Sequence, residues 1–220
     1  MDAMGTKSER EPLNRDVIVA AAVEIADRDG VKGLTMRKLA SSLGYEVMSL
    51  YNHVSNKNEL LALMVDAVAG EVNDPAPEES SLAAVRALAV STRAILVRHP
   101  WASDLWQKYL PGPARTKTME DLLRILHLSG LPPGLAHHGF HAVNNHVLGY
   151  TMQELGMALD TEDPELMGAK AREYVAGLSP EEYPYTIAHV HQHLDGETIS
   201  SFELVLDLIL DGLVGLSERT

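Results

Sequence analysis

The sequence predicts an all-α protein, with a small three-helix head that contains a helix-turn-helix and a larger helical-bundle body behind it. Three observations support this fold class. Apolar residues recur along most of the 220 residues at the spacing of helices that bury one face. No stretch of useful length alternates between apolar and polar residues, as a half-buried strand would. Prolines and glycines interrupt the apolar pattern where one helix would end and the next begin.

The first helix is expected to follow a polar N-terminal segment. Residues 1–12 are polar and include Pro12, so we expect a mobile tail there. Asn14 is a favourable N-cap residue, and Gly30 supplies a stop signal. A helix is therefore predicted between these two positions, and its apolar face carries Val17, Ile18, Ala21, Ala22, Ile25 and Ala26.

The second and third helices are predicted to be short and to be joined by a tight turn. Thr35 can cap the second helix, and Gly44 supplies the positive φ that such a turn often needs. The third helix is expected from about residue 46 to residue 53, and Leu50 and Val54 anchor it inward.

The third helix is expected to expose two apolar residues, Val47 and Met48. Exposure of two apolar side chains to water needs a reason, such as a partner molecule that packs on them. The methyl groups of thymine in a major groove are one such partner. A fourth helix is predicted to run from a cap at Ser55 or Asn56 to about residue 72. Lys57 begins this helix, where its ammonium and the free amide groups could hold a phosphate together.

Charge is distributed unevenly along the chain. The net charge of −13 is unfavourable for a nucleic-acid binder, because phosphates are bound by Lys and Arg. Residues 31–58, however, carry four basic residues and one acidic residue, whereas the chain from residue 74 onward carries 10 basic and 20 acidic residues. A weakly basic head on an acidic body would let DNA meet only the head. The alternative is an acidic cytoplasmic protein whose few lysines are ordinary surface residues.

The segment 49–61, SLYNHVSNKNELL, resembles the closing signature of the helix-turn-helix domain of the TetR family of bacterial transcriptional regulators. The resemblance covers residues 13–72 without a gap. It implies that the third helix lies in the major groove of DNA, with Tyr51, His53 and Lys57 on phosphates. It also implies that Arg37, Val47, Met48 and Asn52 lie near base edges. The full predicted set of DNA-binding residues is Thr35, Arg37, Val47, Met48, Ser49, Tyr51, Asn52, His53 and Lys57.

Each of these roles has a structural alternative. Tyr51 and His53 could be partly buried packing residues, since amphipathic side chains often lie at domain edges. Arg37 could form a surface ion pair on the second helix. Where the tetracycline repressors have Gln-Pro, this chain has Val47-Met48, so its operator is expected to differ from theirs.

A linker is expected over residues 74–81, because two prolines and several acidic residues break the helical pattern there. Beyond it the chain has helical spacing, apart from an acidic loop expected over residues 160–165. Helices are predicted over residues 82–98, 101–109, 114–128, 135–159, 166–176, 180–194 and 198–218.

The last helix is apolar on more than one side, so it must be buried on more than one side. One side can face the chain's own core and the other a second subunit, with glycines allowing close approach. The alternative is a central helix within a monomer. The residues predicted at the dimer interface are Phe202, Val205, Leu208, Ile209, Gly212 and Gly215.

The body also resembles the C-terminal part of the tetracycline-repressor subgroup of the TetR family. The stretches that carry the resemblance are RHPWASDL, LLRILHLSGLPP, LGYTMQE and SFELVLDLILDGL. The resemblance implies a dimer joined by a four-helix bundle and an effector pocket inside each body. The expected domains are a tail over 1–12, a helix-turn-helix DNA-binding domain over 13–73, a linker over 74–81, and an effector-binding and dimerisation domain over 82–220.

An effector pocket is predicted around Trp106. The tetracycline repressors hold a magnesium-chelated drug through a histidine, and counting without gaps from His99 puts Trp106 at that position. Because tryptophan cannot ligate magnesium, an aromatic or largely apolar ligand is expected instead. One stripe of the helix over 135–159 mixes polar and apolar residues, as small-molecule pockets do. The predicted pocket residues are Trp106, Tyr109, His141, Asn144, Leu148 and Thr151.

Two features of this pocket and of the body have alternatives. Asn144 and Thr151 could be hydrogen-bonded within the helix bundle rather than exposed to a ligand. His189, His191 and His193 invite a metal site, but residues two apart point about 200° from one another on a helix. His191 then falls on the apolar face while His189 and His193 point outward. These two alone could share a metal, but no carboxylate lies nearby at a matching spacing, so we expect neither a metal site nor a cofactor.

Other function classes lack support in the sequence. There is no cysteine nucleophile, and no motif of a phosphate-binding loop, a nucleophile elbow or a metalloprotease occurs, so we expect no enzyme. No membrane-spanning segment or secretory signal is recognisable, and a cytoplasmic protein is expected. The competing hypothesis is an all-helical adaptor that binds a protein partner through Val47 and Met48. The favoured one is a homodimeric repressor, released from a near-palindromic double-stranded DNA operator by a small-molecule effector.

Overall fold

The computed structural model describes residues 12–76, 78–159, 164–194 and 201–219, and within these ranges the protein is all-helical, as predicted. The elements begin with α1 (Arg15–Gly33), α2 (Met36–Leu43), α3 (Val47–Tyr51) and α4 (Lys57–Ala69). They continue with α5 (Leu82–Arg98), α6 (Pro100–Leu105), α7 (Pro113–Leu128), α8 (Pro133–Leu159), α9 (Pro164–Ala176), α10 (Pro184–Leu194) and α11 (Ser201–Ser217). The expected tail over 1–12 and the expected loop over 160–165 lie largely outside the described residues.

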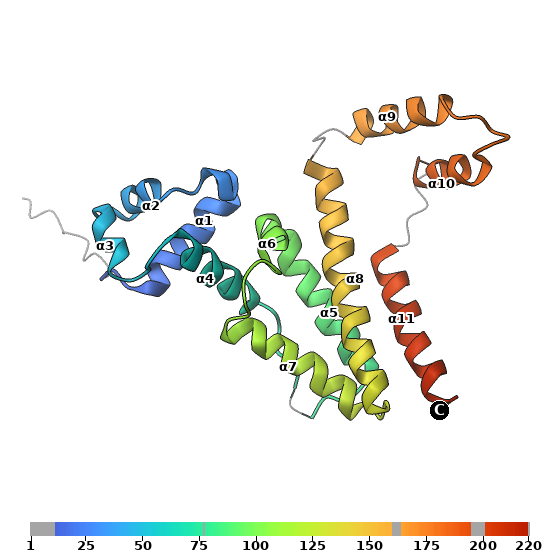
Figure 1. Ribbon diagram of the computed structural model, residues 1–220, viewed down its shortest axis with the longest axis horizontal. Coiled ribbons are helices and arrows are strands. Elements are labelled where there is room, and N and C mark those ends of the chain that lie inside the picture. The colour runs from blue at the N-terminus through green and yellow to red at the C-terminus, as the bar shows by residue number, and fades with distance from the viewer. Residues whose placement is uncertain (1–11, 77, 160–163, 195–200, 220) are drawn as a thin grey trace, which may run out of the picture.

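The head consists of α1 to α4, which pack around one apolar cluster at one end of the molecule (Figure 1). The predicted caps are present: Asn14 Oδ1 accepts a hydrogen bond of 2.8 Å from Val17 N, and Thr35 Oγ1 accepts one of 3.1 Å from Lys38 N. Gly44 ends α2 with a φ of 71°. Gly30 has a φ of 69°, so the chain kinks where α1 was predicted to end, and a further turn continues to Gly33.

Two helices of the head are shorter than predicted. Helix α3 stops at Tyr51 because the amides of His53 and Val54 both donate to the carbonyl of Leu50, which turns the chain toward α4. Buried Val54 holds that turn against the core. Helix α4 stops at Ala69 rather than near residue 72.

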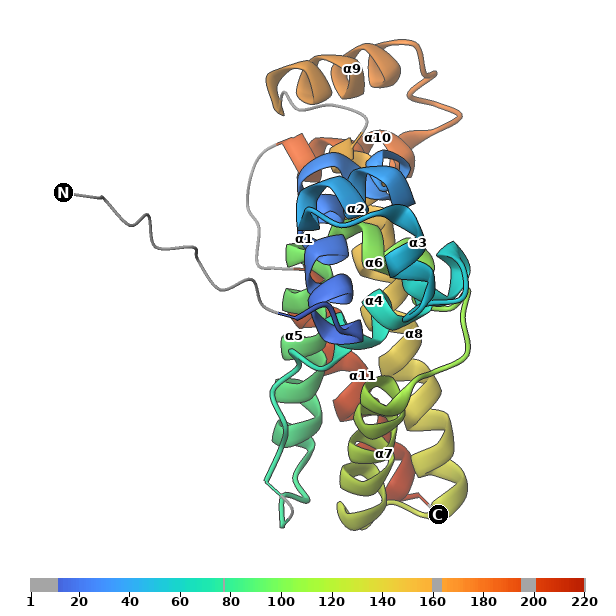
Figure 2. The same ribbon diagram turned by 90° about the vertical axis from the view of Figure 1, so that its left-hand side faces the viewer.

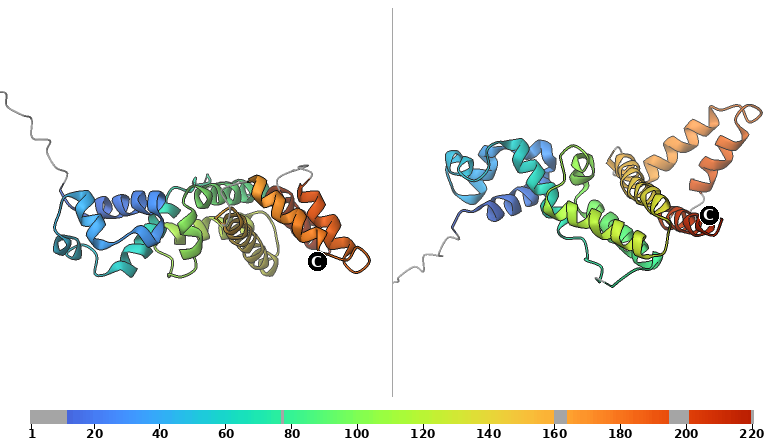
Figure 3. Two further views of the ribbon diagram at one scale, coloured as in Figure 1. Left: turned by 90° about the horizontal axis from the view of Figure 1, so that it is seen from above. Right: turned by 60° about the horizontal axis from the view of Figure 1, so that its bottom comes forward.

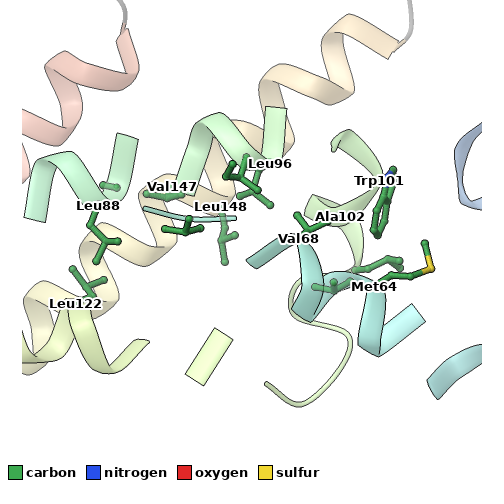
Figure 4. Close-up of a cluster of buried hydrophobic side chains, with 14 of the residues drawn as sticks. Met64, Val68, Leu88, Leu96, Trp101, Ala102, Leu122, Val147 and Leu148 are labelled. Carbon is green, nitrogen blue, oxygen red and sulfur yellow. The ribbon is translucent and has the colours of Figure 1, made fainter. Parts of the chain in front are cut away.

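The body is built on the long helices α5, α7, α8 and α11, with α8 in contact with the other three (Figure 2). Its core joins side chains of α5, α7 and α8, among them Leu88, Leu122 and Leu148 (Figure 4). Helices α9 and α10 pack on one another and stand apart from the bundle (Figures 1 and 3). Within the described ranges, no helix combines the length and apolar character needed to cross a membrane.

Helix α4 belongs to both parts of the molecule. It contacts α1 in the head, and it also contacts α5, α6 and α7 in the body. Its buried side chains Met64 and Val68 lie beside Trp101 and Ala102 of α6 (Figure 4). The core is therefore continuous from head to body through α4. A movement of α4 must displace side chains that pack in the head and side chains that pack in the body.

Helix α6 is shorter than predicted, ending at Leu105 rather than at residue 109. The physical reason lies in α7, from which the Arg115 guanidinium donates to the carbonyls of Trp106, Tyr109 and Leu110. Carbonyls held in this way support an irregular segment, which we call the 106–111 segment.

Candidate nucleic-acid interface and ligand cavity

Helix α3 lies on the outer side of the head, opposite the body (Figure 1). Its inward anchor Leu50 is fully buried, whereas Met48 is 73% exposed. Val47 and Ser49 are half-buried, and Val47 packs partly against the core. Met48 is therefore the apolar side chain that α3 presents most fully, beside exposed Tyr51 and Asn52.

The expected phosphate-binding residues lie at the C-terminal end of α3 and just beyond it. Tyr51 is exposed, and His53 is half-buried. The Lys57 ammonium donates to the carbonyl of Leu34 over 2.6 Å, which ties the start of α4 to the start of α2. An ammonium has three donors, so Lys57 keeps capacity for a further oxygen. Tyr51 is the last residue of α3, and His53 and Lys57 follow it, so the residues expected on phosphates lie at and beyond the C-terminal end of this helix.

Helix α2 adds a basic surface beside α3. Thr35 and Arg37 are both exposed, and no ion pair of Arg37 occurs within the described part of the chain. They line a shallow groove of about 490 Å³, and the groove as a whole is formed by Arg28, Thr35, Arg37, Lys38, Ser41 and Ser42. Hydrogen bonds from Lys38 and Arg28 lower the pKa of Asp29.

Three cations of the head, Arg15, Arg28 and Lys38, were not among the predicted site residues. Arg28 and Lys38 pair with Asp29 over 3.0 and 2.8 Å. Arg15 donates to the carbonyl of His53 and so holds the turn between α3 and α4. The density of basic residues near position 37 was a signal for Lys38, whereas only the fold brings Arg15 to this turn.

The body encloses a cavity of about 490 Å³ between α5, the 106–111 segment, α7 and α8. Five of the six predicted pocket residues line it, namely Trp106, Tyr109, His141, Asn144 and Leu148. Thr151 does not line it. This residue is fully buried, and its hydroxyl donates to the carbonyl of Val147 over 2.6 Å within α8, which is the alternative that the sequence left open.

The lining of the cavity combines an apolar wall with a few polar groups. The apolar wall includes Leu88, Leu122 and Phe140, and the amides of Asn144 and Asn145 reach the same space. The Arg115 guanidinium carbon lies 5.9 Å from the centre of the Trp106 ring. Burial lowers the pKa of Arg115 below its ordinary value. Such a site suits a ligand with a flat apolar face and a small number of polar substituents.

The predicted dimer residues divide between the two sides of α11. Leu208 is 62% exposed, and Val205 and Gly212 are also exposed. Ile209 is partly buried against the core. Phe202 was expected to face a partner, but it is only 1% exposed and stacks on His146 of α8 at a ring-centre distance of 4.7 Å. Phe202 therefore belongs to the inner side of α11.

Glycines mark the outer faces of α8 and α11. A side chain added at Gly149 or Gly156 of α8 would meet open space within the protomer, and the same is true at Gly212 and Gly215 of α11. Exposed Met152 of α8 lies between the two glycines of that helix in the sequence. The backbone of another helix could approach both faces closely.

The three histidines that invite a metal site, His189, His191 and His193, belong to α10. His189 and His191 are both exposed, so the expectation that His191 lies on a buried apolar face is wrong, and the side chain of His193 lies outside the described residues. Among the side chains that are described, no group of three or more His, Cys, Asp or Glu residues could hold a metal ion.

Comparisons with known proteins assign both parts of the chain to one family. The family model described as "Bacterial regulatory proteins, tetR family" matches residues 18–64, and "Tetracyclin repressor-like, C-terminal domain" matches residues 74–216. The transcriptional repressor DrrR1 of Streptomyces coeruleorubidus is 33% identical, with 95% of this chain and 81% of that protein covered. The class D tetracycline repressor of Escherichia coli is 34% identical over 64% of this chain and 66% of its own length.

A solved structure extends the similarity to the whole fold. The TetR family protein ActR of Streptomyces coelicolor, in complex with actinorhodin, has a TM-score of 0.81 and 29% sequence identity. The match covers 94% of this chain and 99% of that one. Together with the two family models, these similarities show that the chain belongs to the TetR family of bacterial transcriptional regulators, whose members bind DNA through a helix-turn-helix.

Proposed function

We propose that this protein represses transcription as a homodimer, by binding a near-palindromic operator and releasing it when a small ligand fills the cavity of the body. The observation that carries the proposal is the exposed face of α3. Met48 is 73% exposed on this face, and the helices next to α3 in the chain carry the cations Arg37 of α2 and Lys57 of α4. In a dimer, two α3 helices would enter successive major grooves, about 34 to 36 Å apart.

The operator is expected to differ from those of the tetracycline repressors. Met48 offers an apolar contact for a thymine methyl group, and Asn52 offers an amide that can pair with adenine. The adaptor hypothesis would use the same face for a protein, but membership of a family of DNA-binding regulators favours DNA as the partner.

Selection of bound fragments from random double-stranded DNA tests the operator. We expect an enriched palindromic consensus with half-sites one helical turn apart, because a two-fold symmetric dimer reads a two-fold symmetric site. Enrichment of single half-sites would contradict the dimeric arrangement, and no enrichment would contradict sequence-specific binding.

The homodimer is proposed to form through the outer faces of α8 and α11. Exposed Leu208 lies near the middle of the α11 face, and the glycines of both helices leave room for a partner's backbone. A second copy of the same faces would complete a four-helix bundle and bury this apolar surface.

Leu208→Glu is therefore expected to convert the dimer to a monomer and to weaken operator binding, since a buried unpaired carboxylate is costly. Light scattering after size-exclusion chromatography measures the mass. Leu128→Glu is the matched control, because Leu128 is 52% exposed at the end of α7, outside the proposed interface. A dimeric Leu208→Glu variant would contradict the proposed interface.

The ligand is proposed to be a largely apolar or aromatic molecule that stacks on Trp106. ActR, a relative of similar fold, is solved with actinorhodin, and this chain supplies an aromatic ring and an apolar wall to its cavity. A magnesium-chelated ligand of the tetracycline type is disfavoured, because Trp106 offers no oxygen or imidazole ligand to the metal.

Actinorhodin serves as the probe of this ligand class. We expect it to bind the wild-type protein, and Trp106→Ala to weaken binding by up to about tenfold through lost stacking alone. Trp106→Phe retains a ring and should lie between the two. Calorimetric titration measures the three affinities. Equal affinities for all three proteins would show that Trp106 does not contact the ligand. No binding by the wild type would exclude actinorhodin-like ligands.

Ligand binding is proposed to act on DNA through α4, the helix shared by head and body. A ligand that binds more tightly to a body conformation with a different spacing of the two heads would weaken operator binding. This weakening cannot exceed the difference between the ligand's affinities for the two conformations. If ligands that raise the melting temperature leave operator affinity unchanged, this coupling is wrong.

A further inference from the structure

The strongest unassigned feature is a polar contact between α4 and the start of α7. Asp66 of α4 accepts hydrogen bonds from the backbone amides of Ala114 and Arg115, over 3.1 and 3.0 Å. These are among the first amides of α7, which have no partner within their own helix. The side chain of Asp66 is only 15% exposed. A residue of the helix shared by head and body therefore caps a helix that lines the cavity.

The sequence before α7 explains why the cap comes from another helix. The residue at the N-cap position is Gly112, which has no side chain to accept these hydrogen bonds. A Cβ added at Gly112 would overlap the carboxyl group of Asp66. The φ of Gly112 is −82°, which any residue adopts, so glycine is required there by the approach of Asp66 and not by the backbone conformation.

Arg115 connects this cap to the wall of the cavity. It is 3% exposed, lines the cavity, and donates to three carbonyls of the 106–111 segment. Its Nε is buried and has no hydrogen-bond partner among the described residues. This Nε lies 4.0 Å from Asp66 Oδ1, whereas a charge-assisted hydrogen bond of this type measures about 2.7 to 2.9 Å. A shift of about 1 Å would therefore pair the two groups.

A second polar joint between head and body shows a different arrangement. Asp27 of α1 lies 2.8 Å from His99 Nδ1, and Trp101 Nε1 donates to it over 2.6 Å. Glu71, just beyond α4, accepts from Arg98 over 2.9 Å. None of these residues lines the cavity. Of these two joints, only the one at Asp66 touches the cavity wall.

We propose that Asp66, Gly112 and Arg115 form a clasp that couples the cavity wall to the head. The inference rests on the proposed function, and it assigns the residues that transmit ligand binding from the cavity to the head. Displacement of the 106–111 segment by a ligand moves Arg115 through the three carbonyls. Asp66 follows, because its carboxylate is bonded to the same turn of α7, and α4 carries that movement into the head. The orphaned Nε gives the clasp a second arrangement in which Asp66 pairs with it. Asp66 is thus a positioning residue that touches neither DNA nor ligand.

Thermodynamic reciprocity provides a test that needs no ligand. If the cavity wall and the head are coupled, operator binding must also change the cavity wall. Trp106 reports this change through quenching of its fluorescence by acrylamide, because Trp101 is buried and Trp106 is more accessible. We expect the ratio of quenching constants with and without the selected operator fragment to depart from 1 in the wild-type dimer. In Asp66→Ala and in Gly112→Ala the ratio should return to 1.

The two variants disturb the clasp from opposite sides, so the double variant Asp66→Ala/Gly112→Ala should behave like Asp66→Ala alone. Glu71→Ala is the matched control, since it also removes a carboxylate near the end of α4 that bonds to the body, and it should keep the wild-type ratio. Circular dichroism melting identifies variants that fold. A wild-type ratio in folded Gly112→Ala would overturn the clasp, as would uncoupling in Glu71→Ala of the same size. Failure of every protein to select an operator would instead contradict the proposed function itself.

Discussion

Arg37→Glu combined with Lys57→Glu is expected to abolish specific operator binding. Arg37 is exposed on α2 in the basic groove, and Lys57 lies at the start of α4 with donors to spare. Loss of one base contact or one phosphate contact weakens binding by a few kcal/mol at most, and reversed charges add repulsion from the phosphates. The two changes together should lower the affinity for the selected operator by roughly 100-fold or more.

Fluorescence anisotropy with a labelled operator fragment measures this loss at several salt concentrations. The control is Lys170→Glu with Arg172→Glu, two exposed cations of α9 whose reversal changes the net charge by the same amount. If the control loses as much affinity as the head variant, long-range charge rather than contact explains the effect. Retained affinity in the head variant would contradict the proposed DNA-binding face.

Phe202→Ala is expected to lower the free energy of unfolding by about 3 to 5 kcal/mol, the usual cost of removing a buried aromatic ring. Phe202 stacks on His146, and the Arg93 guanidinium carbon lies 4.9 Å from the centre of its ring. The variant would leave a cavity and would also remove the nearer of the two rings that the Arg93 guanidinium contacts, the other being Tyr150. The Nε of Arg93 is already buried without a hydrogen bond among the described residues.

Urea unfolding monitored by circular dichroism measures this change, with protein concentration held constant because dimerisation contributes to stability. Leu204→Ala is the matched control, since Leu204 lies on the same helix and is 49% exposed in the protomer. We expect Leu204→Ala to change how the unfolding midpoint depends on protein concentration, and to change the fold of the protomer less. A loss below 1 kcal/mol for Phe202→Ala would place that ring outside the protomer core.

Local signals in the sequence were sufficient for the helices of the head and for the family. Caps at Asn14 and Thr35 and the turn at Gly44 depend on residues within three or four positions of one another, so short-range patterns encode them. The same holds for the apolar spacing that buries Leu50 and exposes Met48. Most of the cavity could also be predicted, because Trp106 stands at a counted position and His141, Asn144 and Leu148 share one stripe of one helix.

Side chains that face a distant helix could not be assigned in this way. Phe202 turns inward because it packs against His146 and Arg93, which belong to helices more than 50 residues earlier in the sequence. Arg86 of α5 holds that orientation by pairing with Glu203 and Asp207 at 2.7 Å each. A helix that is apolar on two sides offers two equivalent faces, and only its neighbours decide which side is inside.

The sequence by itself determined that this chain is an all-helical TetR family regulator, since periodicity, caps and a dense motif are all local properties. The tertiary structure alone decided which residues connect the two parts. Asp66 looks like one more exposed acid of a helix, and Gly112 like an ordinary turn residue, until the fold brings them together 46 positions apart in the chain. Contacts of this kind depend on how whole helices pack, and no pattern of neighbouring residues specifies that packing.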